Sequence, residues 1–100
     1  MLTVEEITRR LTPVFEAGGV TKAVLFGSYA KGTADEDSDV DLVIETEPYI
    51  RGIWIFSLFG DITETLGIDV DVFHRQDIIP GGKADFEIAQ SGLVIYEKHR

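Results

Sequence analysis

The fold is decided by residues 23–42, which read Ala-Val-Leu-Phe-Gly-Ser-Tyr-Ala-Lys-Gly-Thr-Ala-Asp-Glu-Asp-Ser-Asp-Val-Asp-Leu. The apolar start of this stretch is typical of a buried strand, which we expect to cover Val20–Phe26 and to end at Gly27. Ser28 is expected to cap a short helical turn through Tyr29, Ala30 and Lys31, and a polar, acidic loop then leads to a second strand over Asp39–Glu45. The order of strand, glycine turn and strand predicts a fold built on a β-sheet.

The flanking patterns add helices and two further strands. Thr3 and Glu6 form a capping box that begins a helix over Val4–Ala17, which Pro13 is expected to kink or to end early. The other predicted elements are a helix from Pro48 to about Leu66, a strand over Ile68–Phe73, a short helix over Lys83–Ser91 and a strand over Leu93–Tyr96. We therefore expect an α/β (α+β) fold, a single domain over residues 1–100, with a small mixed β-sheet of about four strands and helices packed mainly on one face.

The composition limits the classes of function. The 18 acidic and 9 basic residues give a net charge of −9, which argues against direct binding to nucleic acid and against docking on an anionic membrane surface. The hydrophobic content of 44% is too high for a disordered chain, and the absence of cysteine excludes disulfides and thiolate metal sites. No apolar run reaches the roughly 20 residues of a membrane span. No signal peptide is visible, so a cytoplasmic location is expected.

Gly27, Ser28 and Lys31 predict a phosphate-binding turn. A glycine lets the backbone come close to a ligand, and the free N–H groups at a helix start favour phosphate oxygens. The Ser28 hydroxyl adds a hydrogen-bond donor, and Lys31 adds a mobile positive charge. The neighbouring Tyr29 is expected to be a packing or an exposed residue rather than to stack on a base.

Acidic residues on the second and third predicted strands form a candidate metal site. Asp39 and Asp41 are two residues apart, so both side chains point to the same side of their strand. Asp71, with Asp69 on the same side of the third strand, joins them if the two strands are neighbours. Mg²⁺ usually takes one or two carboxylates together with substrate phosphates, and a pair of metal ions would relieve the repulsion within the cluster.

The ordered set of Gly27-Ser28, Asp39-Val40-Asp41 and a third acid resembles the minimal nucleotidyltransferase family, which belongs to the superfamily of DNA polymerase beta-like nucleotidyltransferases. Members of this family are small domains found beside HEPN-domain proteins as antitoxins. The resemblance extends from Val20 to about Tyr96. It implies a palm-like fold and the transfer of AMP from ATP to a hydroxyl. In the paired systems that hydroxyl belongs to a tyrosine of the HEPN toxin, and the modification silences a ribonuclease.

The resemblance also implies roles for individual residues. The catalytic and metal-binding carboxylates of the family match Asp39, Asp41 and Asp71, and its triphosphate-binding residues match Gly27, Ser28 and Lys31. Lys31 stands where arginine is common, which keeps the charge but loses the forked geometry of a guanidinium. The family usually has one acid on the third strand, whereas this chain has two, Asp69 and Asp71. The correspondence favours Asp71, which would hold one of two Mg²⁺ ions and assist deprotonation of the acceptor.

The predicted middle helix carries two apolar residues outside its core stripe. That stripe is predicted to consist of Trp54, Ile55, Leu58, Phe59, Ile62 and Leu66. Ile53 and Phe56 either pack beneath the Pro48–Gly52 loop or form an exposed apolar patch. An exposed patch would mark a partner surface, and the net charge of −9 favours a partner that is more basic than this chain.

Two other functions stay open. One is a small-molecule nucleotidyltransferase, such as one that modifies an aminoglycoside, with the acceptor held by a partner chain. The other is an antitoxin that occludes its toxin without catalysis, although the presence of all three acids favours chemistry. The sequence does not specify the acceptor, the preferred nucleotide or the oligomeric state.

Overall fold

The structure, a computed structural model, describes residues 1–98 as an alternation of helices and strands. The elements are α1 (Val4–Ala17), β1 (Val20–Phe26), α2 (Ser28–Lys31), β2 (Val40–Thr46), α3 (Ile53–Leu66), β3 (Val70–His74), the 3-10 turn η1 (Arg75–Asp77), α4 (Lys83–Ser91) and β4 (Leu93–Glu97). This order, and the mixed sheet that the four strands form, confirm the predicted fold class.

The sheet has the strand order β3-β2-β1-β4. β1 runs antiparallel to both of its neighbours, whereas β2 and β3 are parallel. Parallel neighbours need a crossover connection, and α3 provides it. As a result, the end of β1, the beginning of β2 and the beginning of β3 all lie at the same end of the sheet, next to α2.

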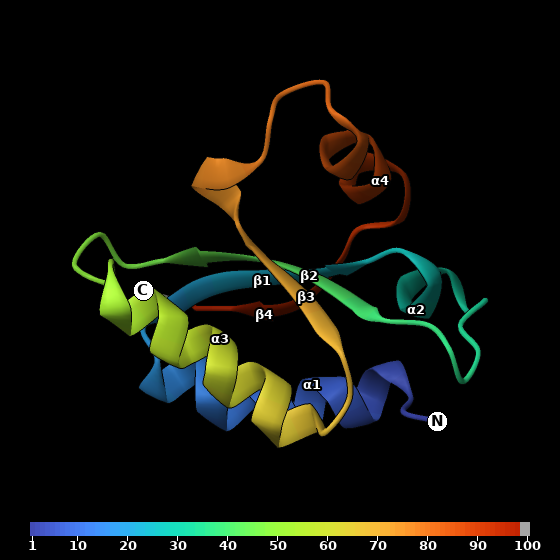
Figure 1. The fold of residues 1–100 in the computed structure, drawn as a ribbon, viewed down its shortest axis with the longest axis horizontal. Coiled ribbons are helices and arrows are strands. Elements are labelled where there is room, and N and C mark those ends of the chain that lie inside the picture. The colour runs from blue at the N-terminus through green and yellow to red at the C-terminus, as the bar shows by residue number, and fades with distance from the viewer. Residues whose placement is uncertain (99–100) are drawn as a thin grey trace.

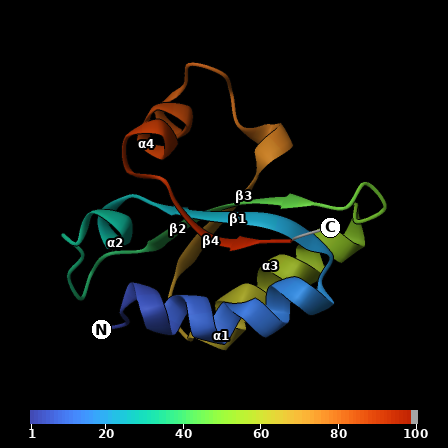
Figure 2. The same ribbon diagram turned by 180° about the vertical axis from the view of Figure 1, so that it is seen from behind.

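The two long helices cover one face of the sheet, and the shorter helical elements α4 and η1 cover the other. α1 and α3 lie together below the sheet in Figure 1, while α4 and η1 lie above it, and the reverse view in Figure 2 shows the same two layers. The core lies between the sheet and the two long helices. Its completely buried side chains include Ile7, Leu11, Phe15, Ala23, Leu25, Val40, Leu42, Ile44 and Ile62. Alternate residues of β2 therefore face this core, and those between them face the layer of α4.

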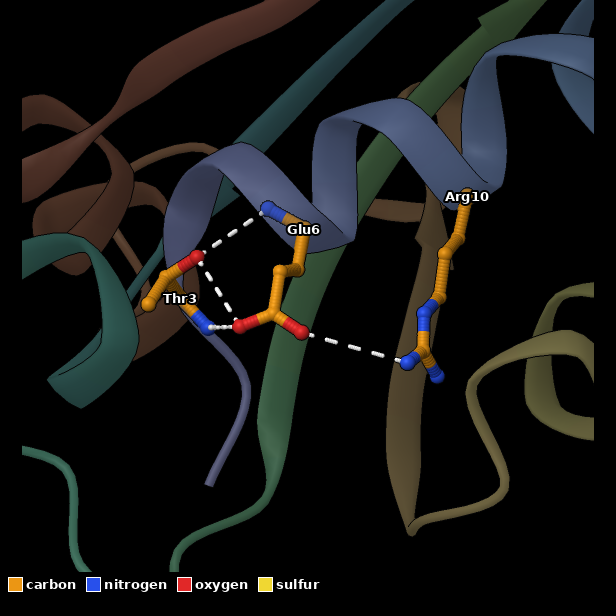
Figure 3. A network of polar contacts seen from close by, with 3 residues as sticks. All are labelled: Thr3, Glu6 and Arg10. Atoms are coloured by element: carbon orange, nitrogen blue, oxygen red, sulfur yellow. Dashed lines mark hydrogen bonds and ion pairs between the residues drawn. The ribbon is translucent and has the colours of Figure 1, made fainter.

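The first helix has the predicted bounds because its cap forms as expected. The Thr3 hydroxyl accepts the Glu6 N–H at 3.1 Å, and the Glu6 carboxylate accepts the Thr3 N–H at 3.3 Å (Figure 3). Arg10 extends the network with an ion pair to Glu6 at 3.9 Å. The helix does not end early at Pro13 but continues to Ala17, because the completely buried Phe15 holds the last turn against the core.

The start of α3 differs from the prediction. Pro48 lies in a loop, where the Ile50 N–H donates to the Glu47 carbonyl at 3.0 Å, and Gly52 has a φ of +62°, which a helix cannot accommodate. The helix therefore begins at Ile53. The predicted core position of Trp54 is wrong: it lies in the first turn at the outer edge of the stripe, and 66% of its surface is exposed.

The remaining boundaries shift only at strand ends, where β2 and β3 begin and end slightly later than predicted and β4 extends to Glu97. Among residues 1–98, none of the helices combines the length and the apolar character that crossing a bilayer requires.

Candidate active site

The turn after β1 brings the backbone against an acidic side chain of β2. Phe26 pairs with Asp41 across the two strands, and Gly27 follows with φ +76° and ψ −153°. Only glycine adopts this conformation readily. A Cβ atom at Gly27 would also overlap the Asp41 carboxylate. The predicted phosphate-binding turn and the predicted carboxylates are therefore adjacent.

α2 is a single helical turn between two glycines, and its N-cap is Gly27 rather than the predicted Ser28, which is the first helical residue. The Lys31 N–H donates to the Gly27 carbonyl at 3.0 Å, and Gly32 ends the turn with a φ of +78°. Tyr29 packs into the core and is only 7% exposed, in agreement with the first of its two predicted placements. Ser28 is half-buried and Lys31 is exposed, so both remain accessible to a ligand.

Asp41 and Asp71 stand side by side on β2 and β3. They are directly paired in the parallel register, and paired residues of neighbouring strands project from the same face of a sheet. The pKa of the Asp41 carboxyl is raised to about 6, first by burial and then by the negative charges of Asp71, Glu87 and Asp39. This concentration of negative charge around a half-buried carboxyl favours a bound cation.

Asp39 and Asp69 lie just before the two strands. The Val40 N–H donates to the Asp69 carbonyl at 3.1 Å, which ties the beginnings of β2 and β3 together. Both acids line a hollow of about 430 Å³ that also includes Ser38. Asp71, rather than Asp69, is thus the acid opposite Asp41. This placement agrees with the choice of Asp71 as the third carboxylate, while the chemical roles of these acids stay predictions.

α4 brings two residues to the site that sequence reasoning missed. Glu87 contributes to the raised pKa of Asp41. The Ser91 hydroxyl accepts the Gly27 N–H at 2.9 Å, although the two residues are 64 positions apart. No local pattern predicts these contacts, because they depend on the pairing of β4 with β1.

His74 and Arg75 make structural contacts at the far end of β3. The buried His74 accepts the Gln76 N–H through Nδ1 at 3.3 Å, so its Nε2 carries the proton and donates to Thr46 Oγ1 at 2.9 Å. Arg75 forms an ion pair with Asp85 of α4 at 3.4 Å. These contacts within the protein account for both residues without a role in the site.

The carboxylates of the site fit a hard divalent cation only if a phosphate supplies further ligands. Within the described residues, no three Asp, Glu or His side chains converge closely enough to hold a metal ion alone. Mg²⁺, however, binds through one or two carboxylates and completes its coordination with substrate phosphates and water. The paired Asp41 and Asp71 supply two carboxylates, and the predicted phosphate-binding turn at Gly27 lies beside them.

Comparison with known proteins gives the family. Residues 9–100 match the family model described as "Polymerase beta, Nucleotidyltransferase". The chain belongs to this nucleotidyltransferase family. The resemblance seen in the sequence is thereby confirmed, as is the predicted enzyme class. One relative, the protein adenylyltransferase MntA of Thermococcus cleftensis, is 35% identical over 85 residues, which cover 81% of this chain and 86% of the relative.

Solved structures share the nucleotidyltransferase fold of this chain. A toxin–antitoxin complex with AMP-PNP matches with a TM-score of 0.74 and 18% identity, over 91% of this chain and 73% of that chain. A complex of the MNT antitoxin with the tri-AMPylated HEPN toxin of Shewanella oneidensis matches with a TM-score of 0.70 and 14% identity, over 96% and 74% of the two chains. At these identities the likeness shows a common fold.

Proposed function

We propose that this chain transfers AMP from ATP to a tyrosine hydroxyl of a HEPN-type toxin and acts as its antitoxin. The transfer forms a bond between the hydroxyl oxygen and the α-phosphorus of ATP, breaks the bond to the β-phosphate and releases pyrophosphate. One observation carries the proposal: the Gly27 turn packs directly against Asp41, which is itself paired with Asp71. The activity of the MntA relative and the AMPylated toxin in the structural neighbour support the choice of AMP and of a protein acceptor.

The turn after β1 is assigned to the triphosphate. The backbone at Gly27 carries no side chain, so phosphate oxygens can approach the N–H groups at the start of α2. The half-buried Ser28 hydroxyl adds a donor at the same place, and the exposed Lys31 contributes a positive charge from the end of the turn.

We assign the acids to the binding of metal ions and to the deprotonation of the acceptor hydroxyl. Asp39, Asp41 and Asp71 would hold Mg²⁺, with two ions expected. When bound, Mg²⁺ neutralises phosphate charge and lowers the pKa of a coordinated hydroxyl. Asp71 lies on β3 and pairs with Asp41 of β2, and we assign its carboxylate to accept the proton that the acceptor hydroxyl loses. A free tyrosine hydroxyl has a pKa near 10 and needs such assistance at neutral pH.

The partner surface is assigned to the first turns of α3. Ile53 and Phe56 are neighbours on this helix and are 76% and 75% exposed. They follow the carboxyl-terminal end of β2, whereas Asp41 lies near its beginning, so the patch and the acids are at opposite ends of the sheet (Figure 1). A toxin that is more basic than this chain could dock on the patch and leave the acids accessible to a second segment of the toxin. We place this reaction in the cytoplasm.

The purified chain incubated with a HEPN toxin encoded beside it, where one is found, and ATP-Mg²⁺ tests the proposal. Intact-mass spectrometry should show adenylyl groups on the toxin, and ribonuclease activity should fall in parallel. Asp41→Asn is the matched inactive variant. If the toxin is neutralised without added mass, the chain acts by occlusion. If the toxin is neither modified nor bound while small hydroxyl compounds are adenylylated, the small-molecule alternative is correct.

A further inference from the structure

The hydroxyl of Ser91 connects α4 to the turn that we assign to ATP. It accepts the Gly27 N–H at 2.9 Å and donates its own proton to the Glu87 carbonyl, also at 2.9 Å. A serine hydroxyl has one proton, so the bond to Glu87 leaves the oxygen lone pairs for Gly27. Both contacts are thus compatible at the same time, and together they determine the orientation of the hydroxyl.

Gly27 depends on this acceptor because of its position. β1 ends at Phe26, and Gly27 is buried, so its N–H is directed away from solvent. A buried N–H without a partner is costly, and the Ser91 hydroxyl is the acceptor that satisfies it. Two of the bonds that define the turn therefore involve Gly27: its N–H is held by Ser91, and its carbonyl is held by Lys31 at 3.0 Å.

Ser91 is itself held in place by tertiary structure. It is the last residue of α4, and β4 begins two positions later with Leu93 paired to Leu25 of β1. At Gly92, between them, a Cβ atom would overlap the Ile88 carbonyl and would lie 3.1 Å from Val24 Cγ1. α4 and α2 lie at the same end of the sheet in both views (Figures 1 and 2). Ser91 is consequently a fixed acceptor rather than a side chain free to follow the turn.

We infer that Ser91 is a positioning residue of the nucleotide site, and this inference rests on the proposed function. By holding the Gly27 N–H, its hydroxyl sets the orientation of the Gly27–Ser28 peptide relative to Asp41. That orientation determines where the Ser28 N–H and hydroxyl point, and hence how well they meet phosphate oxygens. Ser91 does not touch the nucleotide in this scheme and acts through Gly27.

Three substitutions of Ser91 distinguish the effect of losing the hydroxyl from the effect of changing the shape of the side chain. Ser91→Thr keeps a hydroxyl, Ser91→Val has nearly the shape of threonine without it, and Ser91→Ala removes it with the smallest change. The affinity for ATP-Mg²⁺, measured by calorimetry well below the melting temperature, should fall about tenfold in the Val and Ala variants, the value of roughly one lost hydrogen bond. The Thr variant should stay within about threefold of the wild type. Equal affinity in all three, or a Thr variant as weak as Val, would overturn the inference.

A second measurement does not depend on nucleotide binding. Amide hydrogen exchange at Gly27, followed by NMR, should be about tenfold faster in Ser91→Val and Ser91→Ala than in the wild type and Ser91→Thr. Thr63→Ala is the matched control, because Thr63 makes the same kind of bond to the carbonyl four residues earlier, at 3.1 Å, on α3. Unchanged exchange at Gly27 would overturn the inference whatever the protein binds. A wild type that does not bind ATP-Mg²⁺ would instead overturn the proposed function, while exchange would still decide whether Ser91 holds the turn.

Discussion

Replacing Asp41 with Asn should stabilise the metal-free protein at neutral pH. In the folded state the pKa of the Asp41 carboxyl rises from 3.8 to about 6, first because of burial and then because of the charges of Asp71 and Glu87, with Asp39 contributing less. A carboxyl with a higher pKa in the folded state binds its proton more tightly there than in the unfolded chain. The wild type therefore loses stability as the pH rises from 3.8, and the loss is complete above about pH 6.

The size of the effect follows from the shift and the exposure of the side chain. A shift of about two pKa units corresponds to about 3 kcal/mol. Asp41 is only half-buried, so water screens part of the repulsion, and we expect about 1 kcal/mol. Asparagine keeps nearly the same shape without the charge. The free energy of unfolding of Asp41→Asn should thus exceed that of the wild type by about 1 kcal/mol near neutral pH, and the difference should vanish below the unfolded pKa of Asp41.

Urea-induced unfolding in the presence of a chelator, at several pH values between about 3.5 and 7.5, measures this difference. Asp61→Asn is the matched control, because Asp61 is an exposed acid on α3 and its replacement also removes one negative charge from a chain with a net charge of −9. The control should show no comparable gain between pH 4 and 6. A variant that is less stable than the wild type at neutral pH would show that Asp41 is a structural hydrogen-bond acceptor, and the reasoning about repulsion would be refuted.

Three further substitutions test the turn, the third acid and the partner surface. Gly27→Ala should cost about 1–3 kcal/mol in unfolding free energy and abolish ATP binding, because its Cβ overlaps the Asp41 carboxylate and its φ is +76°. Asp71→Asn should still bind ATP-Mg²⁺ but transfer AMP at least ~100-fold more slowly, as measured by mass spectrometry of the partner over time. Replacing both Ile53 and Phe56 with Ser should weaken co-purification with the toxin and leave the melting temperature unchanged, because both side chains are exposed.

Each of these substitutions has a control within the chain. Gly32→Ala also places an alanine at a positive φ, +78°, but in the milder left-handed helical region and with no atom within 4 Å of its Cβ, so it should lose some stability without losing ATP binding. Asp69→Asn should transfer AMP faster than Asp71→Asn, and the reverse order would exchange the roles of the two acids. Ile79→Ser removes a similarly exposed isoleucine, 74% exposed, in the segment after η1 and should leave co-purification intact. Unfolding of the Ile53 and Phe56 double variant would contradict an exposed patch.

The sequence predicts elements well where local signals define both ends. The helices over Val4–Ala17 and Lys83–Ser91 have the predicted bounds, since a capping box begins the first and a glycine follows each. The start of α3 was not predictable from periodicity, because Ile50 lies four residues before Trp54 and continues the apolar spacing beyond the helix. There, Gly52 adopts a positive φ and interrupts the backbone. Backbone conformation at a single glycine, rather than side-chain character, decides that boundary.

Some residues of the site can be predicted from the local sequence, whereas others depend on how the strands pair. Gly27-Ser28 and Asp39-Val40-Asp41 are visible in the sequence because each is formed by consecutive residues at the end of a strand. The choice between Asp69 and Asp71 is not local, since a period of two places both on one side of β3. The family resemblance favours Asp71, and in the structure the parallel register pairs Asp71 with Asp41.

The role of Ser91 depends entirely on tertiary structure. Its contact with Gly27 spans 64 residues and exists only because β4 pairs with β1 and returns the end of α4 to the end of β1. A serine at the end of a short helix carries no signal of such a role, since most such hydroxyls bond to their own helix, as Ser91 also does with the Glu87 carbonyl. The second bond of that oxygen, to an amide at the turn assigned to ATP, is what distinguishes it. The short helix over Lys83–Ser91, to which the sequence assigned no functional role, thus contributes to the geometry of the predicted active site.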